Sequence, residues 1–258
     1  MRNIFAVAGI VIKELYRRKD FYVLFIVTIL ICVVMASVNV FNDAKIVRYL
    51  KEICLLLVWL SSLVIAVTTA ARQIPAEREN RTLLPLLAKP LMRAQLILGK
   101  FLGCWLACGL TLLCFYVFFG ALAASREHQW PVLNYFQAAT LHWFMLGIIV
   151  AMTLLGSLVF AAPSSNSTIC FVVIGGILFV GRHLDRVALT LSEPIRTIVY
   201  SLYFVIPHLE LFDVRDLVIH NWPRIPWTYF SLALLYALGY MAVFLVGACL
   251  VFRRKAVN

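Results

Sequence analysis

Long apolar runs constrain this chain more than any other feature of its sequence. A helix needs about 20 apolar residues to cross a bilayer, because each residue advances it by only about 1.5 Å. The chain is 63% hydrophobic and 14% charged, whereas a soluble domain has about one half and one quarter. We therefore expect an all-α integral membrane protein. Six runs qualify or nearly qualify as transmembrane helices: 21–41, 49–71, 95–124, 136–162, 167–181 and 227–252.

The segment before the first run has a different pattern. Within 1–19, Ile4, Ala8, Val11 and Leu15 follow helical spacing on one face, and the basic residues fall mostly elsewhere. A basic amphipathic helix of this kind lies in the membrane interface rather than across it. The segment therefore predicts an interfacial elbow helix, and we expect no cleaved signal peptide.

The region 182–226, before the last run, does not fit a simple crossing. The fifth run contains two adjacent glycines, and we expect it to end at Gly181. A polar stretch follows, and then the apolar run 195–206, which is too short to cross. Runs of this length are more often re-entrant, with their backbone ends buried against protein. We expect a re-entrant segment here.

The uneven distribution of basic residues orients the chain. If the N-terminus is cytoplasmic and six runs alternate sides, 14 of the 23 Lys and Arg residues but only four of the 12 Asp and Glu residues lie inside. This excess predicts that both termini are cytoplasmic. It also accounts for the net charge of +11, so we do not expect nucleic acid as a partner.

Catalytic signatures are missing from the sequence. A phosphate-binding loop requires G-x-x-x-x-G-K-[ST], but Gly99-Lys100 has Ala94 in place of the first glycine and is followed by Phe101. The seven cysteines form no C-x-x-C pair. We expect no catalytic residue, no metal and no directly bound cofactor.

The loop 72–94 has the most specific pattern, RQIPAERENRTLLPLLAKPLMRA. Pro75 suits the first turn of a helix, and the acidic residues after it suit the positive helix N-terminus. Glu77 and Arg81 are spaced for an i,i+4 ion pair. The residues alone predict a short amphipathic cytoplasmic helix, which either docks on another protein or is a generic interfacial helix.

This loop resembles the signature of the type-2 ATP-binding-cassette (ABC) transporter permeases, in which E-R-E-x-G-T-L precedes P-x-x-R and a later G-K. One departure is Arg81, where the family has glycine. The stretch 207–213 is similar to a P-x-L-x-x-F-D pattern of the family, and the outline agrees over nearly the whole chain. The matching loop residues are Glu77, Arg78, Glu79, Thr82, Leu83, Leu84, Leu86, Leu87, Pro90, Arg93, Gly99 and Lys100.

The resemblance implies one permease domain over 1–258, with no nucleotide-binding domain. It implies a coupling helix in 72–94, and a gate on the extracytoplasmic side formed by Pro207, Leu209, Phe212 and Asp213. The residues expected to couple to an ATPase are Glu77, Arg78, Glu79, Thr82, Leu83, Leu86, Pro90 and Arg93.

The resemblance also implies a function and partners. The chain would be the permease subunit of an ATP-driven exporter in the cell inner membrane, with ATP and Mg²⁺ held by separate ABC ATPase subunits. A second permease protomer completes the complex, a homodimer being favoured over a heterodimer. Membrane lipids and an accessory extracytoplasmic protein are further candidate partners.

Two alternatives remain open. One is an ATP-independent membrane scaffold or assembly factor. The other is a membrane-embedded enzyme that acts on lipids through His183, His208 and Asp213. The scarcity of charge within the runs disfavours a proton-coupled transporter and favours an amphipathic substrate.

Overall fold

The computed structural model describes residues 2–17, 19–37, 44–79, 92–127 and 131–254, and none of these forms a strand. The helices follow one another in the order expected from the apolar runs. Their bounds are α1 (Arg2–Tyr16), α2 (Lys19–Ser37), α3 (Ala44–Arg72), α4 (Pro75–Glu79), α6 (Arg93–Glu127), α7 (Val132–Val159), α8 (Pro163–Thr190), α9 (Ile195–Val205), the 3₁₀ helix η1 (Leu209–Phe212), α10 (Arg215–Ile219) and α11 (Trp227–Arg254).

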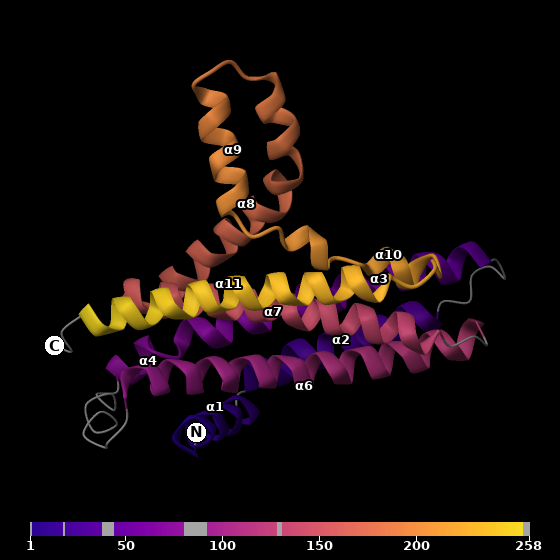
Figure 1. Ribbon diagram of the computed structural model, residues 1–258. Helices are drawn as coiled ribbons and strands as arrows, with labels where there is room; N and C mark the ends of the chain where they lie inside the picture. The colour runs from indigo at the N-terminus through magenta and orange to yellow at the C-terminus, as the bar shows by residue number, and fades with distance from the viewer. Residues whose placement is uncertain (1, 18, 38–43, 80–91, 128–130, 255–258) are drawn as a thin grey trace.

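Helices α3, α6, α7 and α11 run along a common direction and form the body of the molecule (Figure 1). Helix α7 is central. In its most apolar 18-residue stretch 67% of the residues are buried, against 17% in the corresponding stretch of α11. A helix that is apolar all round but exposed on most of its surface requires an apolar solvent. The exposed apolar faces of α11 therefore suit a bilayer.

Helices α6 and α7 are joined by a reciprocal tryptophan pair. The indole N–H of Trp105 donates to the carbonyl of Trp143, and that of Trp143 donates to the carbonyl of Trp105, both at 3.0 Å. The two rings stack with centroids 4.6 Å apart. Gly147, one turn further along α7, has no side chain in the space that Met241 of α11 and Trp105 occupy. Small residues at such a contact allow close helix packing.

Buried hydroxyl groups link α3 to its neighbours. Ser62 lies 2.9 Å from Nε2 of His142 on α7, and Ser61 lies 2.7 Å from the hydroxyl of Thr28 on α2. Buried polar groups need such partners, because their desolvation costs about 1–3 kcal/mol when left unsatisfied. These bonds fix the rotation of α3 between α2 and α7.

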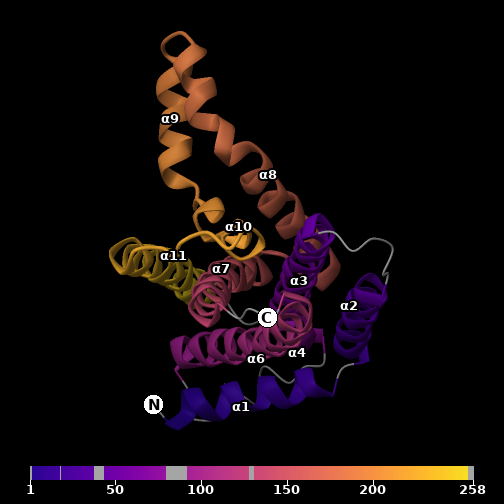
Figure 2. The same ribbon diagram turned by 90° about the vertical axis from the view of Figure 1, so that its right-hand side faces the viewer.

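Helix α1 lies across the bundle rather than along it (Figure 2). It packs on α6 at two glycines one turn apart. A Cβ atom at Gly99 would lie 2.7 Å from Cβ of Val7, and one at Gly103 would lie 2.7 Å from Cβ of Val11. The buried face of α1, which includes Val7, Ala8, Val11 and Leu15, is close to the apolar face that the sequence predicts. Its role as an interfacial elbow stays a prediction.

The far half of α8 and all of α9 form a hairpin that projects away from the bundle (Figures 1 and 2). The sequence predicted a short apolar segment at 195–206, and α9 occupies it. Several of its apolar side chains are exposed, with Ile198 at 65% and Phe204 at 72%. That the segment 195–206 re-enters the membrane stays a prediction.

Within the described ranges, five stretches are long and apolar enough to cross a membrane: Arg48–Glu79, Arg93–Ser125, Val132–Val159, Ile195–Ile219 and Trp227–Arg254. The fourth of these covers α9, η1 and α10 and is interrupted around Pro207. A shorter apolar helix covers Pro163–Phe179. The protein is therefore a multi-pass membrane protein, while the count of six crossings stays a prediction.

The predicted bounds of the fifth run are wrong at both ends. Helix α8 begins at Pro163, so the serine-rich segment at 164–166, which we placed before the run, lies in its first turns. It then continues through Gly175, Gly176 and Gly181 to Thr190. Each glycine costs a helix only about 1 kcal/mol relative to alanine. Interrupting the backbone hydrogen bonds in an apolar setting would cost more.

Gly103→Ala tests the contact between α1 and α6. The new methyl group would collide with Val11, so we expect the free energy of unfolding in detergent to fall by about 1–3 kcal/mol. Gly239→Ala on α11 is the matched control, because nothing lies within 4 Å of its Cβ position. Helix propensity alone should stabilise that variant by up to about 1 kcal/mol. Equal thermal stabilities for the two variants would contradict the contact.

Candidate functional site

The chain turns sharply where α3 ends and α4 begins. Pro75 is the first residue of α4, as the loop pattern predicted, because its missing N–H costs nothing at that position. Ile74 is fully buried, and Pro75 is buried beside it. The turn is therefore packed against the bundle.

Lys100 of α6 holds this turn in place. Its ammonium lies 2.7 Å from a carboxylate oxygen of Glu77, and it donates to the backbone carbonyl of Gln73 at 2.7 Å. It also lies 3.4 Å from the side-chain oxygen of Gln73. Lys100 is only 2% exposed, so its charge depends on these partners. One buried cation thus joins the end of α3, helix α4 and helix α6.

Arg93 holds the other side of the same region. Its guanidinium donates to the carbonyls of Phe252 at 3.1 Å and Arg253 at 3.2 Å, in the last turn of α11. It also lies 5.7 Å from the centre of the Phe252 ring. The last carbonyls of a helix lack partners within the helix, and a cation there also interacts favourably with the helix dipole. Arg93 therefore caps α11 and fixes the start of α6.

A hollow of about 380 Å³ lies beside α4. Thr68, Arg72, Ala76 and Glu79 line it from α3 and α4, and the first residues of α8 line it from the opposite side. We call this part of the molecule the α4 end: the ends of α3 and α11, helix α4, and the starts of α6 and α8 (Figure 1). The described residues therefore leave a recess at the α4 end, between α4 and the start of α8.

The structure describes half of the predicted coupling residues. Glu77, Arg78 and Glu79 form the second half of α4, and Arg93 begins α6. The four that lie outside the described residues are Thr82, Leu83, Leu86 and Pro90. Arg81 is also outside them, so its proposed pair with Glu77 stays a prediction; Glu77 pairs with Lys100.

The predicted gate residues lie together in the segment between α9 and α10, away from α4. Pro207, Leu209 and Phe212 are buried in and beside η1. Asp213 accepts hydrogen bonds from Nε of Arg215 at 2.7 Å and from its Nη2 at 2.9 Å. The hydroxyl of Tyr236 on α11 accepts from the backbone N–H next to Pro207. The segment is thus packed on the bundle, while its role as a gate stays a prediction.

A family model for the ABC-2 family transporter protein matches residues 7–257. The chain belongs to the ABC-2 transporter family. A comparison with curated proteins finds no match. Members of the ABC-2 family are transmembrane subunits, are not themselves catalytic, and normally work with an ABC ATPase subunit.

The residues of the enzymatic alternative are only partly brought together. His183 and Asp213 line one cavity, but His208 packs between the rings of Tyr203 and Tyr236 and does not line it. Asp213 is engaged by Arg215. Among the described residues, no group of three or more His, Cys, Asp and Glu is arranged to hold a metal ion.

Two contacts at the α4 end could not be derived from the sequence. Lys100 and Glu77 are 23 positions apart, and Arg93 meets α11 about 160 positions later. The sequence indicated Lys100 only as part of the Gly99-Lys100 pair that matches the loop signature. A basic residue within an apolar run nevertheless indicates a buried contact, because its charge needs a partner there.

The ion pair between Glu77 and Lys100 can be measured by a double-mutant cycle. Lys100→Gln should lower the free energy of unfolding, because it leaves the Glu77 carboxylate without its cation. Glu77 keeps 22% of its side-chain exposure, so the loss should stay below the roughly 3–5 kcal/mol of fully buried pairs. The double variant Glu77→Gln with Lys100→Gln should lose less than the sum of the two single variants.

Unfolding in detergent, followed by intrinsic fluorescence, gives the four stabilities. Glu79→Gln is the control, because Glu79 is exposed on the same short helix. It should change the stability by no more than about 0.5 kcal/mol. Strict additivity of the two single changes would refute the pair.

Proposed function

We propose that this ABC-2 family protein is the permease subunit of an ATP-driven exporter, with ATP hydrolysed by a separate ABC ATPase that binds the α4 end. The single observation that carries the proposal is the anchoring of α4 by Lys100. A force applied to α4 would reach α3 and α6 directly, because the same ammonium binds both sides of the turn. Transmission through packed, hydrogen-bonded elements is how a distant motion reaches a transport path.

Arg93 supports the same proposal. The described residues stop at Glu79 and resume at Met92, and Arg93 is fixed to the last turn of α11. The described residues on both sides of this gap are therefore tied to helices of the bundle. A partner that pushes or pulls this region would move α3, α6 and α11 together.

The charge of the α4 end supports a cytoplasmic placement. Arg72, Arg93, Arg253 and Arg254 are exposed there. Cytoplasmic ends of membrane helices are rich in Lys and Arg, and an ABC ATPase needs cytoplasmic ATP. The opposite end, with the predicted gate at Pro207 to Asp213, would then face the outside. A second protomer, an inner-membrane location and an accessory outer protein belong to the same proposal.

A charge reversal on α4 tests the proposal. The chain is co-purified with a candidate ABC ATPase subunit, and ATP hydrolysis of the complex is measured. Glu79→Lys changes an exposed residue of α4 and should weaken the complex by roughly tenfold, equivalent to about 1.4 kcal/mol. ATP hydrolysis by the complex should fall in parallel.

Arg224→Glu is the control, because it reverses an exposed charge at the other end of the bundle. It should leave both the complex and its ATP hydrolysis unchanged. A chain that forms no complex, or a complex indifferent to Glu79→Lys, would favour the ATP-independent scaffold instead.

A further inference from the structure

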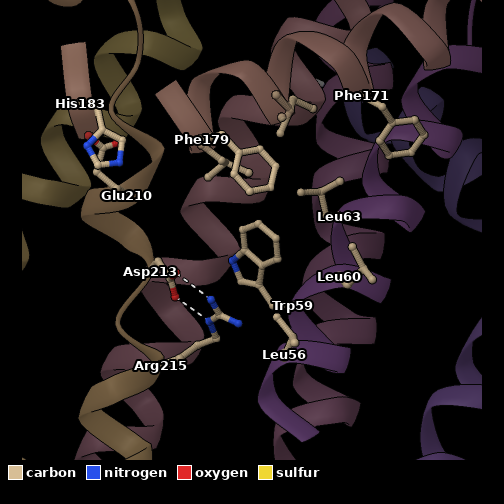
Figure 3. A pocket seen from close by; sticks show the side chains of 13 residues that line it. Leu56, Trp59, Leu60, Leu63, Phe171, Phe179, His183, Glu210, Asp213 and Arg215 are labelled. Atoms are coloured by element: carbon tan, nitrogen blue, oxygen red, sulfur yellow. Dashed lines mark hydrogen bonds and ion pairs between the residues drawn. The ribbon is translucent and has the colours of Figure 1, made fainter. Parts of the chain in front are cut away.

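A cavity of about 560 Å³ lies between α3 and α8, away from the α4 end (Figure 3). This volume is within the range of about 300–1,000 Å³ that is usual for small-molecule sites. Helix α3 contributes one wall through Leu56, Trp59, Leu60 and Leu63. Helix α8 contributes the facing wall, and η1 with the start of α10 closes one end.

The walls of this cavity are apolar and open sideways. Leu56 is 47% exposed, Leu60 is 51% exposed, and Phe179 of α8 is 81% exposed. In a multi-pass membrane protein, such a sideways opening between two helices meets lipid rather than water. The occupant that can reach the cavity is therefore a molecule of the membrane.

One end of the cavity is polar. Asp213 and Arg215 form a two-point ion pair there, so their charges offset each other. The guanidinium carbon of Arg215 lies 5.2 Å from the centre of the Trp59 ring. Glu210 also lines this end of the cavity. Among the described residues, no Lys or Arg forms an ion pair with Glu210 as Arg215 does with Asp213. His183 of α8 also lines this end and lies beside Glu210 (Figure 3), so the end carries a carboxylate and an imidazole next to the Asp213–Arg215 pair.

Two buried polar atoms of this end have no hydrogen-bond partner within the described part of the chain: the indole N–H of Trp59 and Oε2 of Glu210. Figure 3 shows the indole nitrogen of Trp59 turned toward the polar end. A buried donor and a buried acceptor without partners are uncommon and call for a ligand or water. The indole N–H of Trp59 is a hydrogen-bond donor, and the Glu210 carboxylate is an anionic acceptor.

We propose that this cavity binds one membrane lipid whose headgroup carries a phosphate and a primary ammonium. The ammonium donates to Glu210, which accepts it as a charge-assisted hydrogen bond. The phosphate accepts from the Trp59 indole and from the guanidinium N–H groups that Arg215 does not use for Asp213. The acyl chains lie along Leu56, Leu60 and Phe179. This site is a property of the chain alone and goes beyond its proposed work with an ATPase.

The headgroup chemistry excludes the commonest alternatives. A choline headgroup carries the positive charge but has no N–H to donate to Glu210. A glycerol headgroup leaves the phosphate charge without an ammonium, so the lipid is repelled by Glu210. A site with a buried hydrogen-bonding group discriminates against a ligand that cannot make the bond, because that group is then left unpaired.

Native mass spectrometry of the purified chain without any ATPase tests the proposal. Equal amounts of phosphatidylethanolamine, phosphatidylcholine and phosphatidylglycerol compete for the protein in one detergent solution. We expect a single bound phosphatidylethanolamine to exceed each competitor by about tenfold, the effect of one charge-assisted hydrogen bond. Equal binding of the ethanolamine and choline lipids would overturn the proposal.

Two variants locate the binding. Glu210→Gln should abolish the preference for phosphatidylethanolamine over phosphatidylcholine, whereas Glu193→Gln, an exposed carboxylate before α9, should keep it. Leu63→Trp should lower the binding of all three lipids, because it fills the cavity without touching the polar end. An unchanged preference in Glu210→Gln, or unchanged binding in Leu63→Trp, would show that the lipid binds elsewhere.

Discussion

A single buried ammonium, that of Lys100, organises the end of the bundle from which the α4 helix emerges. Its desolvation would be costly in an apolar interior, so it must be met by oxygen atoms. The oxygens that meet it belong to Gln73 and Glu77, which are the residues where the chain leaves α3 and enters α4. The position of α4 is therefore a consequence of satisfying one cation. Any partner that holds α4 also holds α6.

At the opposite end of the bundle, a buried ammonium is again met by oxygen atoms. Lys51 of α3 is fully buried and lies 3.4 Å from the carbonyl of Val218 and 3.3 Å from Oδ1 of Asn221. Asn134 and Gln137 of α7 donate to backbone carbonyls in the segment before α11. Side chains of the long helices thus satisfy the backbone of the connecting segments, which lipid could not do.

The sequence predicted the long helices well, because apolar runs of a given length have few alternatives in a membrane. It also predicted the start of α4 at Pro75, where local chemistry is decisive. It failed at α8, because a serine-rich segment and three glycines normally indicate turns, but Asn166 is instead bonded to Thr153 of α7. The pairs that define the two ends of the bundle join residues distant in sequence, so no local pattern could predict them.

The central claim, that the α4 end is where an ABC ATPase binds this ABC-2 family protein, is tested most directly by photo-cross-linking. A photoreactive amino acid is placed at position 79, and in a second protein at position 224, and each is irradiated in complex with the ATPase. Both positions are exposed, at opposite ends of the molecule. The account predicts a cross-link to the ATPase from position 79 and none from position 224. A cross-link from position 224, or none from position 79, would contradict it.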